Sequence, residues 1–243
     1  MKDKQKPYTI LHFDSNLFGY AVGRINSDVN PINLSNTLKT ARREGLRLLY
    51  WFVDPKDDKA LEVAQKYSGC LASEKVTYRL HAARIKRPML PIQEVSVYKH
   101  TNLTKEIRSL ALQCGIFSRF ATDRHFVRKE YIKLYTIWIK KSVNRAIAFT
   151  VLVYRDFTKK VRGFITLERK NKEGHIGLFV VDKNFRGRSI GNFLMQEALR
   201  IFVRNSFREI LVTTQDENLA ARTFYKKFGF TEVKREITYH FWL

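Results

Sequence analysis

The sequence predicts an α+β protein in two parts, a small α/β domain over residues 1–92 and a larger domain over residues 93–243. Three features predict this organisation. Strand-like runs alternate with helical segments in the first part, which is typical of a β-α-β-α-β unit. In the second part, three strand-like runs follow one another with hairpin-sized spacing, which favours antiparallel pairing. A glycine-containing loop then joins a buried strand to an amphipathic helix.

The first part is expected to begin with a turn between two short strands within residues 10–25, because Asp14, Ser15, Asn16 and Gly19 interrupt the apolar residues there. The elements that follow are a helix over residues 34–44, a buried strand over 46–53, a helix over 59–67 and a strand over 74–80. Pro88 and Pro91 favour a domain boundary within residues 85–91.

Helical spacing predicts two helices at the start of the second part, over residues 104–114 and 129–143. The apolar face of the second helix is formed by Tyr131, Leu134, Tyr135, Trp138 and Ile139. The three antiparallel strands are expected over residues 146–154, 161–168 and 175–181. A helix from Ile190, a strand over 208–214, another helix and a last strand from Phe230 complete the chain.

Composition excludes several classes of protein. Apolar residues make up 44% and aromatic residues 13% of the 243 residues, which is too much for a disordered chain. Two cysteines, Cys70 and Cys114, are too few for a disulfide framework or a cysteine-rich zinc site, so we expect a reducing, cytoplasmic compartment. No apolar run has the length of a membrane helix, and residues 1–10 are not followed by the apolar region of a signal peptide.

The chain carries 45 basic and 23 acidic residues, a formal net charge of +22. Such a charge is typical of proteins that bind RNA, a membrane surface or phosphorylated ligands. Solvated surface charge explains it equally well. The basic residues do not form the long block of a disordered nucleic-acid arm.

The loop between the strand over 175–181 and the helix from Ile190 carries the main chemical signal. It contains Arg186, Gly187, Arg188 and Ser189. A loop at a helix N-terminus presents unpaired backbone N–H groups and the positive end of the helix dipole to an anion. Guanidinium groups suit phosphate. The loop matches neither a P-loop nor a dinucleotide fingerprint, and taken alone it is equally consistent with a structural turn.

The next helix has a clear beginning and end. Asn218 is suited to cap its N-terminus, and Gly229 is suited to follow its C-terminus. The apolar face between them consists of Ala221, Phe224, Tyr225 and Phe228.

Two motifs resemble those of the GNAT superfamily of N-acetyltransferases. Residues 186–191 resemble its loop for the pyrophosphate of an acyl-CoA, Gln/Arg-x-x-Gly-x-Gly/Ala, and residues 218–230 resemble its Asn-x-x-Ala…Tyr…Gly-Phe motif. They occur in the order of that superfamily, and the resemblance covers roughly residues 95–243. Ser189 stands where the loop has glycine. If this position needs a positive φ, a serine costs about 1–2 kcal/mol.

This resemblance implies a fold, an acyl donor and site residues. The fold is a mixed, mostly antiparallel twisted sheet flanked by helices, and the donor is acetyl-CoA, with no metal. A backbone N–H of the strand over 178–181 is implied to stabilise the oxyanion. The residues implied to bind acetyl-CoA are Leu178, Phe179, Val180, Val181, Arg186, Gly187, Arg188, Ser189, Ile190, Gly191, Asn192 and Asn218.

Three other stretches, residues 13–19, 117–120 and 133–143, resemble the TDP-fucosamine acetyltransferases. These enzymes acetylate the 4-amino group of a TDP-linked 4-amino-4,6-dideoxygalactose, and they also carry a small α/β domain ahead of the acetyltransferase fold. The resemblance implies that the acceptor is the amine of an amino sugar, a TDP-linked 4-amino-4,6-dideoxyhexose. Ser118, Arg119 and Phe120 are then expected to face this nucleotide sugar, with helix-end packing as the alternative.

The implied reaction is direct attack of the amine on the thioester. Tyr225 occupies the position of the general acid in the superfamily motif; without that motif it would be an aromatic residue on an apolar helix face. Glu74 is our hypothesis for the general base, and a solvated carboxylate at a strand end is the alternative.

Two other functions remain open at this point. One is an acetyltransferase for a protein N-terminus, a polyamine or an aminoglycoside. The other is a non-enzymatic RNA-binding module, although the chain has no aromatic-basic RNA motif, so nucleic acid is not the expected partner. A homodimer could form through sheet edges or through the aromatic-rich residues 239–242.

Overall fold

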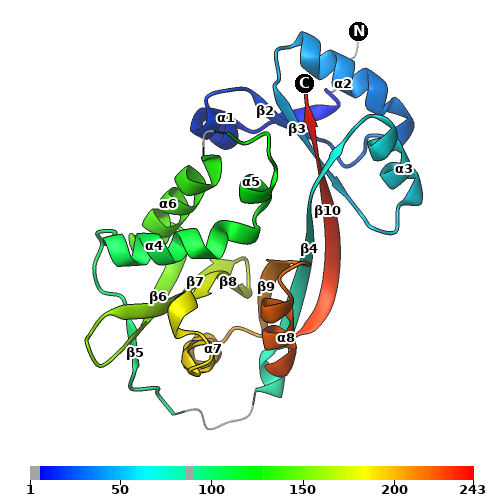
Figure 1. Ribbon diagram of the computed structural model, residues 1–243. Coiled ribbons are helices and arrows are strands. Elements are labelled where there is room, and N and C mark those ends of the chain that lie inside the picture. Colours follow the sequence, from blue (N-terminus) through cyan, green and yellow to red (C-terminus); the bar gives the residue numbers. More distant parts are fainter. Residues whose placement is uncertain (1–5, 86–89, 128) are drawn as a thin grey trace.

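The computed structural model describes residues 6–85, 90–127 and 129–243 (Figure 1). Its strands form one sheet in the order β1-β2-β3-β10-β4-β9-β8-β7-β6-β5. The strands are β1 (Tyr8–Ile10), β2 (Val22–Ile25), β3 (Leu48–Val53), β4 (Cys70–His81), β5 (Val95–Val97), β6 (Ala148–Arg155), β7 (Val161–Lys170), β8 (Glu173–Val181), β9 (Glu209–Gln215) and β10 (Thr231–Trp242). The α-helices are α1 (His12–Phe18), α2 (Leu34–Arg43), α3 (Asp58–Lys66), α4 (Lys105–Cys114), α5 (Arg119–Thr122), α6 (Glu130–Val143), α7 (Ile190–Arg204) and α8 (Leu219–Lys227).

Most of the predicted elements are confirmed within a few residues. Strands β6, β7 and β8 are antiparallel neighbours, as the hairpin-sized spacing predicts. β8 pairs with β9 in parallel, which makes the sheet mixed.

One prediction in the first part is wrong: residues 12–18 form helix α1 rather than a turn. The helix is short, but its environment stabilises it. The Ser15 hydroxyl donates to the Leu11 carbonyl and accepts from the Val22 N–H. Phe18 is 2% exposed, and Gly19 ends the helix at φ 78°. The helix thus depends on contacts with residues outside it and on the glycine that caps its C-terminus. In the sequence, a run of polar residues followed by a glycine is equally compatible with a turn.

The sheet is continuous from the first part of the chain to the last. β10 lies between β3 and β4 and is antiparallel to both. β4 in turn pairs with β9. The proposed division of the chain at residue 92 therefore falls between segments that share one sheet, and residues 86–89, including Pro88, lie outside the described residues.

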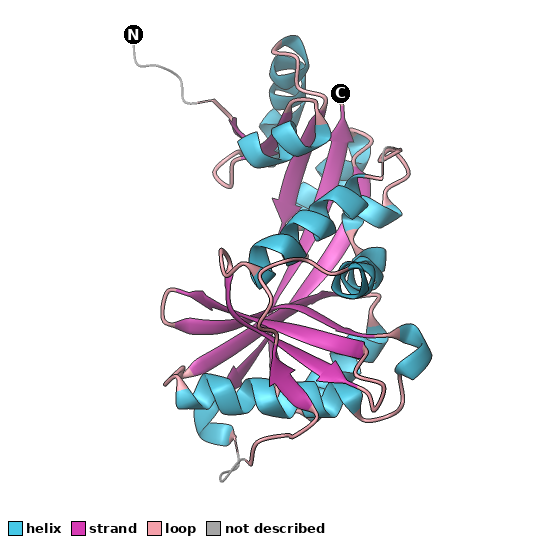
Figure 2. Cartoon of the chain, turned by 90° about the vertical axis from the view of Figure 1, so that its left-hand side faces the viewer, coloured by secondary structure: helices cyan, strands magenta, loops and turns pink. Residues whose placement is uncertain are grey.

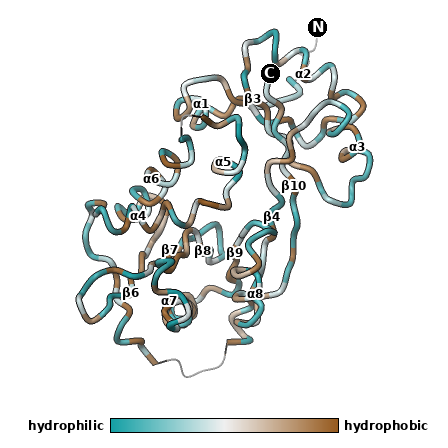
Figure 3. Tube along the Cα trace, in the orientation of Figure 1, coloured by the Kyte–Doolittle hydropathy of each residue, from teal (hydrophilic) through white to brown (hydrophobic). Residues whose placement is uncertain are grey.

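Helices cover both faces of this strongly twisted sheet (Figure 2). α4 and α6 pack on β6–β8, and α7 packs on the opposite face together with Tyr225 of α8. α2 and α3 cover one face of β3 and β10. Phe18 of α1 and the aromatic residues around α5 cover the other. Hydrophobic stretches accordingly run along strands such as β6 and β7 (Figure 3).

Asp123, just after α5, fixes that segment to the end of β10. Its side chain is fully buried and accepts hydrogen bonds from His240 Nδ1 at 2.6 Å and Trp242 Nε1 at 3.0 Å. His125 binds it through both its backbone N–H and its ring. The C-terminal aromatic residues are therefore part of the core, with Tyr239, His240 and Phe241 at most 4% exposed. This corrects the expectation that they could form a dimer surface.

No helix in the described ranges is both long enough and apolar enough to cross a membrane.

Replacing Asp123 with Asn should lower the free energy of unfolding by about 3 kcal/mol. The amide keeps the shape of the carboxylate but turns an N–H donor toward groups that are themselves donors, inside a buried site. Urea denaturation measures the loss. The exposed Asp28→Asn is the matched control, and equal stabilities for the two variants would contradict this role of Asp123.

His240 should make the stability depend on pH. Burial lowers the pKa of His240 from 6.5 to about 4, and the hydrogen bond to Asp123 opposes this shift. Between these values the unfolded chain binds a proton that the folded chain does not, so stability falls as the pH drops from 6.5 to 4. The contribution is about 3 kcal/mol at most. His240→Gln should lose less stability over this window than the wild type, whereas His12→Gln should match it.

Candidate functional site

The loop before α7 has the geometry of an anion site. Gly187 and Ser189 both adopt the left-handed conformation, with φ 77° and 58°. This is the positive φ that the glycine of the superfamily motif provides, so Ser189 carries the strain predicted for it. Within the described part of the chain, the backbone N–H groups of residues 187–192 donate to no acceptor. The loop and the first turn of α7 thus present a row of free donors.

Arginine side chains surround this row of donors. Arg188 is exposed, and its guanidinium lies 5.0 Å from the centroid of the Phe185 ring. Arg162 packs on the same ring at 3.9 Å and is paired with Asp156 at 2.6 Å. The Arg186 Nε donates to the Val181 carbonyl at 3.3 Å. Arg186 and Arg188 are both exposed, so the charge of each is open to a ligand.

β8 and β9 diverge next to this loop. Their pairing runs from Gly174 with Ile210 to Ile176 with Val212 and stops there. Residues 178–181 of β8, which the sequence assigns to acetyl-CoA, pair with β7 only. A bulge interrupts that pairing opposite Thr166, whose hydroxyl accepts from the Leu178 N–H at 2.7 Å. The Leu178 N–H is thus already used, which removes it from the candidate oxyanion donors.

Tyr225 approaches the divergence from α8. Asn218 caps this helix through the Ala221 N–H at 3.2 Å, as predicted. The Tyr225 ring is 5% exposed and packs against Tyr78 and Phe230. Burial, together with the nearby Cys114 thiol, raises the pKa of Tyr225, so its hydroxyl is protonated at neutral pH.

Cys114, at the end of α4, lies on the other side of this divergence from Tyr225. It was not among the site residues expected from the sequence. Its thiol donates to the carbonyl of Phe179 on β8 at 3.6 Å, and burial raises its pKa to about 11. Its position at the end of a predicted helix gave no sign of this contact.

Glu74 lies on the Tyr225 face of the sheet. Val76 and Tyr78, two and four residues further along β4, point to the same face as Glu74 and pack in the core beside α7 and Tyr225. Its Oε1 accepts from Arg235 at 2.5 Å, and Arg235 also contacts Asp216 at 3.0 Å. Glu74 therefore lies inside β4 rather than at a strand end, and its carboxylate is paired rather than simply solvated. Its Oε2 forms no hydrogen bond within the described residues.

Ser118, Arg119 and Phe120 lie on the opposite face, over β3 and β10. Ser118 and Arg119 are 4% and 7% exposed. The Arg119 guanidinium lies 4.2 Å from the centroid of the Tyr50 ring and 4.7 Å from that of Phe120. Phe120 also packs against Phe18. The structure thus brings Tyr225 and Glu74 to one face and Ser118–Phe120 to the other.

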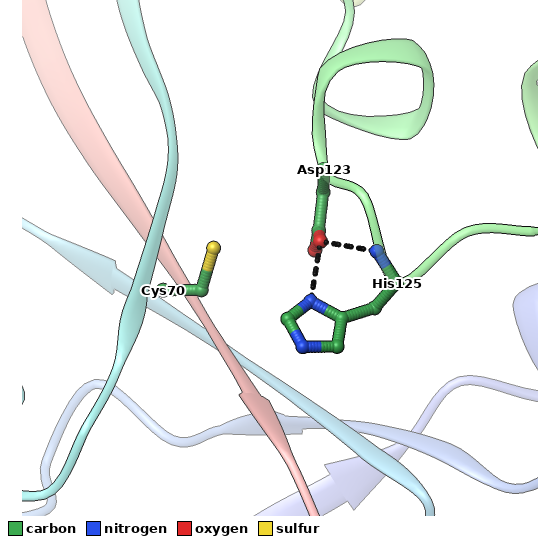
Figure 4. Close-up of side chains that lie close together, drawn as sticks. All are labelled: Cys70, Asp123 and His125. Carbon is green, nitrogen blue, oxygen red and sulfur yellow. Dashed lines mark hydrogen bonds and ion pairs between the residues drawn. The ribbon is translucent and has the colours of Figure 1, made fainter.

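Cys70, Asp123 and His125 form one group whose side-chain atoms could reach a metal ion (Figure 4). Their possible ligand atoms lie within 4.8 Å of one another. Both oxygens of Asp123 already accept hydrogen bonds, and His125 Nδ1 is one of the donors at 2.8 Å. A metal would have to displace these bonds, so we assign Asp123 a structural role.

Ser189 should be replaceable by glycine with a gain of about 1 kcal/mol in the free energy of unfolding, because glycine adopts φ 58° without strain. Ser206, at φ 61° after α7, should behave in the same way. Ser109, inside α4, is the control, and glycine there should cost about 0.5 kcal/mol, because serine is a better helix former than glycine. If Ser189→Gly lost as much stability as Ser109→Gly, Ser189 would not be under backbone strain.

Comparison with known proteins agrees with this geometry. Residues 110–230 match the model of the Acetyltransferase (GNAT) family. N-alpha-acetyltransferase 30 of Dictyostelium discoideum is 33% identical over 69 residues, which is 28% of this chain and 37% of that protein. N-alpha-acetyltransferase 30 of Schizosaccharomyces pombe is 33% identical over 67 residues, 28% of this chain and 45% of that protein. The match thus spans less than half of these curated relatives.

Solved structures share the whole fold. A GCN5-related N-acetyltransferase from Sphaerobacter thermophilus aligns over 97% of this chain and 76% of its own, with a TM-score of 0.62 and 13% identity. A functionally unknown conserved protein from Staphylococcus epidermidis aligns over 98% of this chain and 92% of its own, with a TM-score of 0.66 and 14% identity. The chain has the GNAT fold, and its residues 110–230 match the Acetyltransferase (GNAT) family.

Proposed function

We propose that the protein transfers an acetyl group from acetyl-CoA to the primary amine of an amino sugar, a nucleotide-linked 4-amino-4,6-dideoxyhexose. The observation that carries the donor half is the row of free backbone N–H groups at residues 187–192, beside a segment of β8 that lacks a β9 partner. Ile190, Gly191 and Asn192 are buried or half-buried, and N–H groups in such positions normally have an acceptor, which a pyrophosphate would supply.

The residues around the loop fit such a donor. The N–H groups of residues 187–192 would hold the pyrophosphate, with Arg188 and Arg186 adding positive charge. Backbone groups of Leu178–Val181 that face the divergence would pair with the amide-containing arm of the coenzyme. The Asn218 carbonyl oxygen is used in the helix cap, which leaves its amide N–H₂ for that arm.

Tyr225 is the proposed general acid. Its protonated hydroxyl would donate to the leaving thiolate, whose own pKa is near ~8.5. Glu74 is proposed as the acceptor of the amine's proton through its free Oε2, while Arg235 holds Oε1 in place. Attack by the free amine forms the C–N bond, and collapse of the intermediate breaks the C–S bond.

The acceptor class rests on Arg119 and Ser118. A buried guanidinium over aromatic rings suits a ligand that combines charge with a flat or sugar-like body. Phe120 would act through Arg119, since its ring packs on Phe18. A protein N-terminus is the competing acceptor, because curated relatives of part of this chain are N-alpha-acetyltransferases.

A thiol-release assay with acetyl-CoA should give turnover on TDP-linked 4-amino-4,6-dideoxyhexoses and little on spermidine or a short peptide with a free N-terminus. Tyr225→Phe should lower kcat by about a hundredfold, because a general acid contributes a factor of this order. Tyr67→Phe, after α3, should leave kcat unchanged. Turnover on the peptide alone would show that the acceptor is a protein N-terminus and not an amino sugar. An unchanged kcat in Tyr225→Phe would exclude Tyr225 as the general acid.

A further inference from the structure

A set of buried polar atoms lies on the sheet beneath α5 without hydrogen-bond partners. Among the described residues these include Ser73 Oγ, Thr238 Oγ1, His240 Nε2, and both Nε and Nη1 of Arg119. Their residues are between 0% and 7% exposed. We call this set the α5 polar cluster.

The strand register places these residues next to one another. Thr238 of β10 is directly opposite Ser73 of β4 and Phe52 of β3. His240 is two residues further along β10, opposite Tyr50, and the two rings lie 4.9 Å apart. Arg119 lies over the same two β3 side chains, 4.2 Å from the Tyr50 ring centroid and 5.3 Å from that of Phe52.

Lys75 adds a second positive charge to the cluster. It is two residues from Ser73 on β4, on the same face, and it is half-buried. Burial lowers the pKa of Lys75 to about 8, and the positive charge of Arg119 contributes to this shift. Neither Lys75 nor Arg119 has a carboxylate oxygen within 4.0 Å in the described ranges of the chain.

The nearest acidic side chains are committed elsewhere. Glu236 accepts from Lys234 Nζ at 2.6 Å. Asp14 is close enough to Arg119 to interact with its charge, but burial raises the pKa of Asp14 and so disfavours its charged form. The Arg119 plane is fixed by aromatic rings on which it stacks, but stacking satisfies none of its N–H groups. Leaving the buried N–H groups of Arg119 unpaired is costly, and the hydroxyls of Ser73 and Thr238 can donate as well, so these three residues are suited to receive an acceptor from outside the chain. His240 donates to Asp123 through Nδ1, so its Nε2 is itself an acceptor and takes no part in this.

The cluster is connected to the divergence of β8 and β9. Lys75 pairs with Gln215 at the end of β9, where β9 has no β8 partner. Ser118 follows the α4 end that carries Cys114, and the Cys114 thiol contacts Phe179 of β8. A separate pocket of about 370 Å³ beside α5 is lined by Cys70, Phe117 and Asp123 among others, and none of the residues of the cluster lines it.

We propose that the α5 polar cluster binds an acidic group, a phosphate or a carboxylate, carried by the acetyl acceptor. Arg119 and Lys75 supply the charge, and the hydroxyls of Ser73 and Thr238 supply further hydrogen bonds. This deepens the proposed function and rests on it, because it names the residues that would hold the acidic group of the acceptor, which in a nucleotide-linked sugar is the diphosphate.

The test measures anion binding with the coenzyme site filled. Thermal unfolding is followed in saturating coenzyme A, with inorganic pyrophosphate or succinate added at constant ionic strength. A ligand that binds the folded state raises the midpoint in proportion to its affinity. We expect one of the two anions to raise it, and which one does so distinguishes a phosphate from a carboxylate.

Variants assign this effect to the cluster. Arg119→Met should weaken the apparent anion affinity at least tenfold. Arg169→Met is the matched control, since Arg169 also stacks on a ring, Phe207 at 4.7 Å, and its loss changes the net charge equally. Ser73→Ala and Thr238→Val test the cluster if Arg119→Met does not fold, and each should weaken binding severalfold.

Two failures are distinguishable. No shift with either anion, or equal losses in Arg119→Met and Arg169→Met, would overturn the anion site while leaving acetyl transfer intact. No shift with coenzyme A itself would instead overturn the proposed donor site. Once an acceptor is found, Arg119→Lys should raise its KM more than it lowers kcat, because the residue holds the substrate and takes no part in proton transfer.

Discussion

The backbone pairing of β10 with β3 on one edge and β4 on the other holds the two parts of the chain in a single sheet. Removing β10 would leave β1–β3 without a connection to the acetyltransferase sheet. The hydrogen bonds of Asp123 to His240 and Trp242 then fix α5 over the same strand. The position of Arg119 in α5 therefore depends on residues more than a hundred positions away in the sequence.

The loop before α7 and the α5 polar cluster show the same kind of compromise between stability and binding. At the donor loop, Ser189 adopts a strained backbone conformation and the following amides lack acceptors. At the α5 polar cluster, side-chain donors are buried without partners. Both arrangements cost free energy in the chain alone, and both are of the kind that a bound polar ligand relieves.

The sequence was most informative where function depends on local structure. The Asn218 cap and the strand-loop-helix around residues 186–191 were predictable, because each involves residues close together in the chain. The possibility of a positive φ at Ser189 came from the resemblance of the loop to the superfamily motif. Helix α1 was not, since contacts with Val22 and the burial of Phe18 stabilise it.

The α5 polar cluster could not have been predicted either. Ser73, Arg119 and Thr238 meet only because β10 takes its place between β3 and β4, a pairing that no local pattern indicates. Glu74 was singled out on β4, but its neighbour Lys75 points to the other face, where the unpaired donors lie. A single step in strand alternation thus separates a residue on the Tyr225 side from one on the α5 side.

The central place of β10 has a consequence for biosynthesis. Residues 48–53 of β3 are almost entirely apolar and buried in the finished sheet, yet one edge of this strand stays open until residues 231–242 have left the ribosome. An apolar strand with an open edge is a template for pairing with other chains. The nascent chain therefore exposes an apolar strand edge during the interval between making β3 and making the strand that covers it.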